Sequence, residues 1–252
     1  MKAIWDIRPI TNTDVAVITA TSALTGYPVT NLSLIQPMKF WKSANLNSGT
    51  TLHWDFQSTQ AFSGFFLNRF NFGSFTLYGS INNATWVTLA TVTNAVQDEL
   101  KDENYMHYYC SITGSYRYYK LVIISASANF GETTFRVGNA LFGTEVIIWN
   151  PAPPFKVVGS PKVDVVVYDS NYSNSYKSGR GKHILDGNFD KITVSEYIKI
   201  VKTINPFVIS LSDFTLDNND SYLVKATPQN GFEKSYEYTA VVDMPFHWEE
   251  VV

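Results

Sequence analysis

The sequence is poor in cysteine and in charge. Its 252 residues include one cysteine, Cys110, and 16% are Asp, Glu, Lys or Arg, well below the usual quarter. A single cysteine excludes an intramolecular disulfide framework and a cysteine-rich zinc site. Because it lies in the run Tyr-Tyr-Cys-Ser-Ile, which is typical of a strand, we interpret it as a buried small hydrophobe rather than a nucleophile.

Other absences exclude whole classes of partner. The formal net charge is −3, so the basic footprint of a nucleic-acid binder is missing. No apolar run approaches the length of a membrane span, and the N-terminal residues lack the apolar region of a secretory signal. We therefore expect no nucleic-acid partner and no membrane span.

Nothing in the sequence has the spacing of a catalytic group. The four histidines lie in unrelated contexts, and neither a nucleophile elbow nor a phosphate-binding loop is present. A glycosidase needs two carboxylates that face each other across a cleft. The acidic pairs at 98–99 and 249–250 are adjacent and would point apart on a strand. We expect no enzymatic activity and no cofactor.

What the sequence does contain favours β-structure. Apolar residues make up 45% of it and aromatic residues 15%, a composition that suits strands. Residues 51–56 alternate, with Leu52, Trp54 and Phe56 on one face and polar residues on the other. The run of residues 64–72 is nearly continuous in aromatic residues, as in a strand covered on both faces. Further strands are predicted over residues 75–80, 85–92, 116–124 and 133–142.

A composition break divides the chain. Three prolines between residues 151 and 154 interrupt a continuous strand, because proline has no backbone N–H. We predict a first domain over residues 1–147, a proline-rich linker over 148–155 and a smaller domain over 156–252. In the smaller domain residues 162–168 are predicted as a strand, and residues 169–187, rich in Ser, Asn and Gly, as a long loop.

The smaller domain has one predicted helix. Thr193 and Glu196 form a capping box, and apolar residues follow at helical spacing until Asn205-Pro206 stops the helix. Strands are predicted again over residues 207–211, 222–227 and 236–242. The helix would cover one face of a small antiparallel sheet.

Five segments of the first domain follow one another in the order of a known family. They are residues 40–43, 51–56, 75–86, 116–121 and 135–143. They include Phe-Trp-Lys-Ser and the hairpin Phe-Thr-Leu-Tyr-Gly-Ser followed by Asn-Asn-Ala-Thr-Trp. In this order they resemble discoidin domains, also called F5/8 type C or galactose-binding-like domains. The resemblance implies an antiparallel jelly-roll β-sandwich. We therefore predict a mainly β chain: this sandwich, followed by a smaller α+β domain with one helix on an antiparallel sheet.

Binding in the resembled family occurs on loops at one end of the sandwich. A sugar site needs an aromatic face for stacking and planar polar groups for the hydroxyls. The candidate ligand-binding residues of these types are Trp41, Asn45, Asn47, His53 and Arg117. In the alternative interpretation, Trp41 is a core residue and the others are ordinary surface.

Two other tryptophans are predicted to be core, and no metal is expected. Trp54 faces inward by alternation, and Trp86 opens a strand after a turn. The calcium loop of many discoidin domains corresponds to residues 28–47, which contain neither Asp nor Glu. Because hard cations prefer charged oxygen ligands, we expect that site to be missing.

The second domain resembles, in style, small domains of tailed-bacteriophage tail and baseplate proteins. The resemblance lies in the runs Ile-Thr-Val-Ser-Glu-Tyr-Ile-Lys-Ile and Asn-Pro-Phe-Val-Ile. It implies a non-enzymatic virion protein of the tail or tail tip, assembled in the host bacterial cytoplasm. Its partners would be other tail proteins and copies of itself in a ring. The loop at 169–187 would order on a neighbouring subunit, and the sandwich would serve assembly or contact host-surface glycan. The alternatives are a free carbohydrate-binding module and an unrecognised glycan-cleaving enzyme.

Overall fold

The structure is a computed structural model that describes residues 2–4, 17–34, 39–93, 95, 106–147, 152–167, 173–193, 207–210, 221–226, 235–238 and 241–250. Side chains are described over residues 17–34, 39–93, 95 and 106–145. The chain forms two compact units. The first comprises Met1–Ile147 with Phe207–Tyr222, and the second comprises Ile148–Pro206 with Leu223–Val252.

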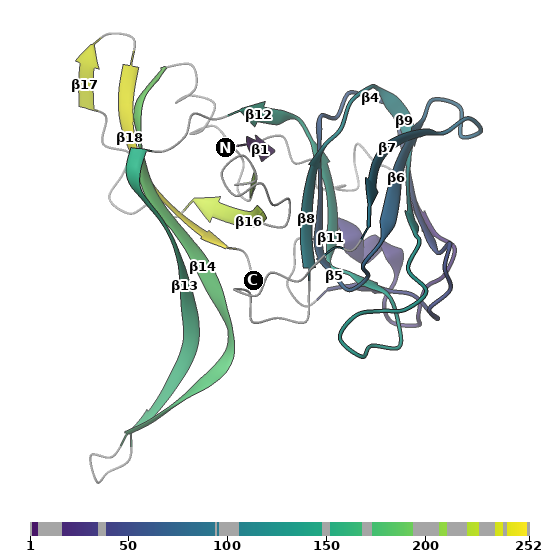
Figure 1. Cartoon of the computed structure of the whole chain (residues 1–252), viewed down its shortest axis with the longest axis horizontal. Coiled ribbons are helices and arrows are strands. Elements are labelled where there is room, and N and C mark those ends of the chain that lie inside the picture. Colours follow the sequence, from purple (N-terminus) through teal and green to yellow (C-terminus); the bar gives the residue numbers. More distant parts are fainter. Residues whose placement is uncertain are drawn as a thin grey trace. The chain divides into compact units, whose positions relative to one another are not determined.

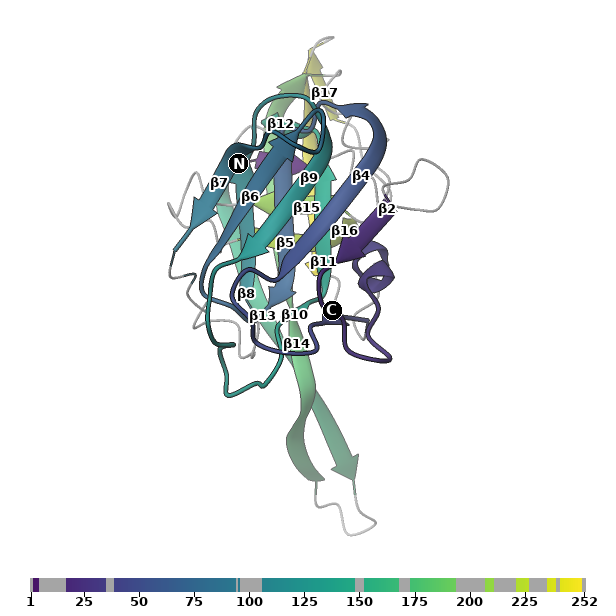
Figure 2. The same ribbon diagram turned by 90° about the vertical axis from the view of Figure 1, so that its right-hand side faces the viewer.

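One layer of the first unit is a five-stranded antiparallel sheet, seen face-on in Figure 2. Across the sheet its strands are β2 (Val17–Ala20), β4 (Thr51–Gln60), β9 (Tyr116–Ile123), β6 (Phe75–Ser80) and β7 (Val87–Val92). The strands predicted over residues 51–56, 75–80, 85–92 and 116–124 are therefore confirmed.

The other layer is a three-stranded antiparallel sheet, and the two layers form a β-sandwich (Figure 1). Its strands are β11 (Asn139–Gly143), β5 (Gly64–Phe70) and β8 (Met106–Ser111). A short antiparallel pair and one 3₁₀ helix accompany the layers: β3 (Trp41–Lys42), β10 (Arg136–Val137) and η1 (Val29–Ser33). The predicted antiparallel β-sandwich is confirmed.

Alternation along the strands places the core between the layers. In β4 the side chains of Leu52, Trp54 and Phe56 are buried, whereas those of Thr51, His53 and Asp55 are partly exposed. Strand β9 has the same pattern. Burying a large apolar side chain stabilises a fold by about 1.5–3 kcal/mol, so this alternation determines which face of each strand turns inward. Trp54 is a core residue, as predicted.

Phe142 of β11 lies at the centre of the aromatic core. Its ring centroid lies between 4.8 and 5.5 Å from those of Trp54, Phe56, Phe62, Phe65 and Tyr119. Edge-to-face and offset contacts of this kind stabilise a core beyond the area they bury. The five neighbours come from both layers, so Phe142 joins the two sheets.

The first unit also contains three short strands from distant parts of the chain. Strand β1 (Lys2–Ile4) pairs antiparallel with β12 (Glu145–Ile147) and with β15 (Phe207–Ser210). Strand β15, which was predicted as part of the second domain, is therefore paired within the first unit. Over the described ranges, no helix has the length and apolar character needed to cross a membrane.

The second unit contains an antiparallel sheet, as predicted for the second domain. Its strands are, in order, β13 (Ala152–Val167), β14 (Ser173–Thr193), β18 (Val241–Glu250) and β16 (Ser221–Ala226), with β17 (Ser235–Tyr238) paired to β18. Only the backbone of these strands is described.

The predicted loop at 169–187 is wrong from Ser173 onward, where the chain forms β14. Ser, Asn and Gly have low strand propensity, but propensity depends strongly on context. Strand β14 pairs with β13 from Ser173 to Asn188 and with β18 from Ile184 to Thr193. This pairing outweighs the local composition.

The segment predicted as a proline-rich linker overlaps the start of β13. Pairing of β13 with β14 changes register between Ala152 and Lys156, the stretch that contains Pro153 and Pro154. Proline cannot donate to a ladder, so the prolines interrupt the pairing without ending the strand. Thr193 is the last residue of β14, and the helix predicted to follow it lies outside the described residues.

Candidate functional site

The outer face of the five-stranded sheet carries two adjacent rows of side chains, set by the register of its strands. One row consists of Val17, Asp55, Tyr118 and Ser80. The next row consists of Thr19, His53, Lys120 and Tyr78. Neighbouring strands lie about 4.8 Å apart, so register partners contact one another across the strands. Polar and aromatic groups far apart in sequence meet on this face.

Aromatic rings form the floor of this region. The His53 ring stacks on Tyr118, with centroids 5.9 Å apart, and meets the Trp86 ring edge-on at 5.8 Å. Trp86 lies just before β7 and is partly exposed. The prediction that Trp86 is a core residue is wrong, because the turn before β7 places the indole on the outer face and not between the layers.

The turn between β6 and β7 positions the side-chain amide of Asn83 beside His53. Asn82 Oδ1 accepts hydrogen bonds from the backbone N–H groups of Ala84 (3.0 Å) and Thr85 (2.9 Å), which closes an Asx turn. Asn83 has a φ of 59°, in the left-handed region that Asn tolerates. Its Oδ1 lies 3.0 Å from His53 Nε2. Because an amide oxygen only accepts, the imidazole donates here, and the Asn83 amide nitrogen carries two further donors.

Asp55 is fixed by a two-point ion pair. Arg117 Nε donates to Oδ1 at 2.7 Å, and Arg117 Nη2 donates to Oδ2 at 2.9 Å. The backbone N–H of Gln57, at a bulge with φ 61°, also donates to Oδ1 at 2.8 Å. The hydrogen bond from Arg117 is the main reason that the pKa of Asp55 lies below its usual value of 3.8. Oδ2 accepts one of these bonds and retains a lone pair for another donor.

We expect the stabilisation from this ion pair to be lost in acid. The pKa of Asp55 is lower in the folded than in the unfolded chain, so the pair stabilises the fold above the unfolded-state pKa, and its contribution disappears as the pH falls through the folded-state value. Urea unfolding from neutral pH to below pH 3.8 should show a weaker acid dependence for Asp55→Asn than for the wild type. Equal dependence in the two proteins would contradict the assignment.

These side chains enclose an open depression of about 630 Å³. Its lining residues are Val17, Thr19, His53, Asp55, Asn83, Trp86, Tyr118 and Lys120. The volume lies within the range of small-molecule sites, about 300–1,000 Å³. The lining combines aromatic rings with polar groups of both kinds, donors and acceptors.

The structure places the five sequence-predicted site residues in different environments. His53 lines the depression, and Arg117 holds Asp55 in place while its guanidinium carbon lies 4.8 Å from the centroid of the Tyr118 ring. Asn45 and Asn47 are exposed and do not line it. Trp41 has an exposed fraction of 0%, and its indole N–H donates to the carbonyl of Ser22 at 3.0 Å. Its ring therefore offers no surface for stacking.

Sequence reasoning missed most of the lining residues. Asp55, Tyr118 and Lys120 are partly exposed and alternate with buried residues of β4 and β9. The same alternation that predicted the core marks these positions as outward-facing. The outward orientation of these residues was therefore predictable from the sequence. The alternation did not show that the outward-facing residues of β4 and those of β9 are register partners.

Cys110 is buried in β8, as predicted. Burial raises the pKa of its thiol to about 12, so the sulfur stays protonated and is a poor nucleophile. Within the described part of the chain, no group of three His, Cys, Asp or Glu side chains is arranged to hold a metal ion.

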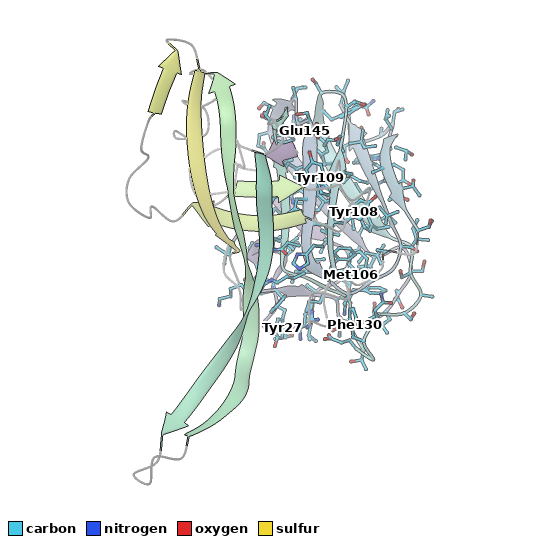
Figure 3. All side chains as sticks on the ribbon, turned by 60° about the vertical axis from the view of Figure 1, so that its left-hand side comes forward. Tyr27, Met106, Tyr108, Tyr109, Phe130 and Glu145 are labelled. Carbon is cyan, nitrogen blue, oxygen red and sulfur yellow. The ribbon has the colours of Figure 1, made fainter. Side chains whose placement is uncertain are left out.

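A second polar cluster lies on the three-stranded layer. The hydroxyls of Tyr109 and Ser111 both donate to Glu145 Oε2, and Figure 3 labels Tyr109 and Glu145 on this side of the unit. Burial, followed by the hydrogen bond to Glu145, raises the pKa of Tyr109 far above its ordinary value. Because Glu145 opens β12, the cluster ties that strand to β8.

Several carbohydrate-binding modules of known structure are similar to about half of this chain. No protein-family model matches the chain, and no curated protein sequence matches it. A chitosan-binding module from a chitosanase/glucanase of Paenibacillus sp. IK-5 is 15% identical, covers 50% of this chain and 93% of its own, and has a TM-score of 0.42. The family 32 module of C. perfringens NanJ, in complex with galactose, is 13% identical and covers 58% and 100%, with a TM-score of 0.42.

The family 32 carbohydrate-binding module of Streptococcus pneumoniae EndoD is 11% identical, covers 51% of this chain and 95% of its own, and has a TM-score of 0.41. All three of these solved structures are carbohydrate-binding modules.

Proposed function

We propose that the β-sandwich is a non-enzymatic carbohydrate-binding module whose site is the depression on the outer face of the five-stranded sheet. One observation carries the proposal: a single open depression contains both aromatic rings and polar groups that are already held in place. An extended saccharide needs such an open surface, since both of its ends must leave the site.

The chemistry of the lining suits a sugar ring. A sugar presents C–H groups on its faces and hydroxyls around its edge. Trp86 and Tyr118 offer amphipathic rings with an apolar body and a polar tip. Asp55 Oδ2 accepts from a hydroxyl hydrogen, and the Asn83 amide nitrogen donates to a hydroxyl oxygen.

The polar groups are ordered before a ligand arrives. Asp55 is held by Arg117 and by the backbone of Gln57, and Asn83 is held by His53 and its turn. Binding therefore pays little of the entropy of ordering side chains, about 0.5–1.5 kcal/mol for each flexible one. Because this cost is small, a ligand that makes few contacts, such as one sugar unit within a longer chain, can still bind.

Replacing Trp86 by alanine is expected to weaken saccharide binding at least about tenfold, which corresponds to about 1.4 kcal/mol, because it removes the largest ring of the depression. The measurement is a glycan array followed by calorimetry of the best ligand with the full chain. Tyr27→Ala is the matched control, since Tyr27 is also a partly buried ring under a lysine, with Lys42 Nζ 4.6 Å from its centroid, and it does not line the depression.

Binding that is saturable, lost in Trp86→Ala and kept in Tyr27→Ala supports the proposal. Absence of saturable binding to every glycan, or binding that Trp86→Ala leaves unchanged, contradicts it. Trp41→Ala is unsuitable for this purpose, because the buried Trp41 ring contributes to the core and its loss reports on folding.

The hypothesis of a bacteriophage tail protein, ringed with copies of itself and with other tail proteins in the virion, stays a prediction. No feature of the described residues favours it over sugar binding. Deleting residues 169–187 would not test it cleanly, because the deletion removes most of β14, which pairs with β13 and β18. The mass of the native assembly tests the ring directly.

A further inference from the structure

We propose, on the basis of the carbohydrate-binding function above, that the depression selects saccharides that carry a carboxylate or sulfate group, and that Lys120 receives this group. The inference rests on where the charges of the depression lie and on which of them are already neutralised.

The two charges at one end of the site cancel. Asp55 is negative, but Arg117 neutralises it through a two-point ion pair. An anionic ligand therefore meets no uncompensated negative charge at Asp55. Apart from His53, the other ionisable cationic side chain of the lining is that of Lys120.

Lys120 has aromatic partners and, among the described side chains, no acidic one. Its Nζ lies 3.9 Å from the centroid of Trp86 and 5.3 Å from that of Tyr78. Among the side chains that the structure describes, no carboxylate lies within ion-pair distance of it. Its ammonium carries three donors, and an aromatic face attracts the cation without forming a conventional hydrogen bond to each of them.

Partial burial makes an anion favourable at this position. Lys120 is partly buried in the middle of the sheet, and the loss of hydration lowers its pKa. A half-buried cation binds a carboxylate or sulfate more strongly than a fully hydrated one, because the surrounding dielectric screens the attraction less. The rings that flank Nζ also restrict where the ammonium lies.

The positions of Lys120 and Asp55 fit a single sugar unit with an acidic substituent. His53 and Lys120 are register partners, and Asp55 and Tyr118 are partners in the adjacent row. Lys120 and Asp55 are therefore diagonal neighbours on one face. A sugar over His53 and Tyr118 would present its anionic group to Lys120 and a hydroxyl hydrogen to Asp55.

The test compares oligosaccharides that differ only in charge. The probes are neutral oligosaccharides and the same backbones bearing uronate, sialate or sulfate, and, for uronate ligands, the free acid against its methyl ester. The variants are Lys120→Met, which keeps an unbranched apolar chain over the rings, and Lys120→Arg, which keeps the charge. Lys42→Met is the control, because Lys42 also lies over a ring but not in the depression. Thermal unfolding of each variant checks that the fold is retained.

We expect the wild type to bind the acidic form at least about tenfold more tightly than the neutral form, as for a hydrogen bond to a charged group, with a preference that declines as salt is added. Lys120→Met should lose the preference, and Lys120→Arg and Lys42→Met should keep it. Equal binding of acidic and neutral forms, or a preference that survives Lys120→Met, overturns the inference while binding itself still supports the carbohydrate-binding function. Failure of every probe to bind overturns both.

Discussion

Replacing Phe142 by alanine is expected to lower the free energy of unfolding by about 3–5 kcal/mol. Its ring contacts five aromatic neighbours from both layers of the sandwich, so the change removes buried apolar area and leaves a cavity whose walls are large rigid rings. Such walls close poorly over a gap, which places the cost toward the upper end of the range.

Urea unfolding of the full chain, followed by tryptophan fluorescence, measures this loss. Ile81→Ala serves as the surface control, because Ile81 is 68% exposed and its loss should change stability by less than about 0.5 kcal/mol. A Phe142→Ala protein as stable as Ile81→Ala would show that the two layers are not joined through this ring.

Replacing Gly114 by alanine is expected to lower the free energy of unfolding by about 2–5 kcal/mol, from two additive causes. Gly114 has a φ of +102°, and a Cβ there would lie 2.6 Å from Cε2 of Tyr116. A left-handed backbone costs a residue with a side chain about 1–2 kcal/mol, and overpacking costs about 1–3 kcal/mol. The ring of Tyr116 is also close to Gly79, where a Cβ would meet Cδ2 at 2.5 Å, so it has little room to move.

Three other glycines separate the two causes. Gly49 has a φ of +87° with nothing within 4 Å, so Gly49→Ala carries the backbone cost alone. Gly79→Ala carries the clash alone, and Gly73→Ala, with neither, should be close to neutral. The unfolding free energies of the four variants, each measured with and without Tyr116→Ala, give the comparison. Removing the Tyr116 ring should relieve Gly79→Ala and part of Gly114→Ala. A Gly114→Ala variant no less stable than Gly49→Ala would contradict the expectation.

The core of the sandwich was predictable because its signal is local. Leu52, Trp54 and Phe56 alternate with polar residues, and a strand turns successive side chains to opposite faces. The pattern is complete within six residues and needs no knowledge of the partner strand. The same holds for Cys110, whose neighbours identify a strand.

The candidate site was predictable only in part. His53 and Arg117 were identified from their residue types: His53 lines the depression, and Arg117 is bonded to Asp55, which also lines it. Trp86 was predicted to be a buried core residue because it follows a turn and begins a strand. The Asx turn at Asn82 instead sets the chain on the outer face, and no periodicity in a turn reports which way its residues point.

The sequence alone determined that this protein is mainly β, which residues of β4 face inward, and that its cysteine is buried, because each of these follows from the order of residues along one strand. Tertiary structure alone decided that Asp55 meets Arg117, 62 residues away, and that His53 meets Asn83, 30 residues away. It also decided that residues from Ser173 onward form β14 rather than a loop. These outcomes depend on the register between strands, which is set by long-range pairing and by the packing of whole faces, so no single segment contains them.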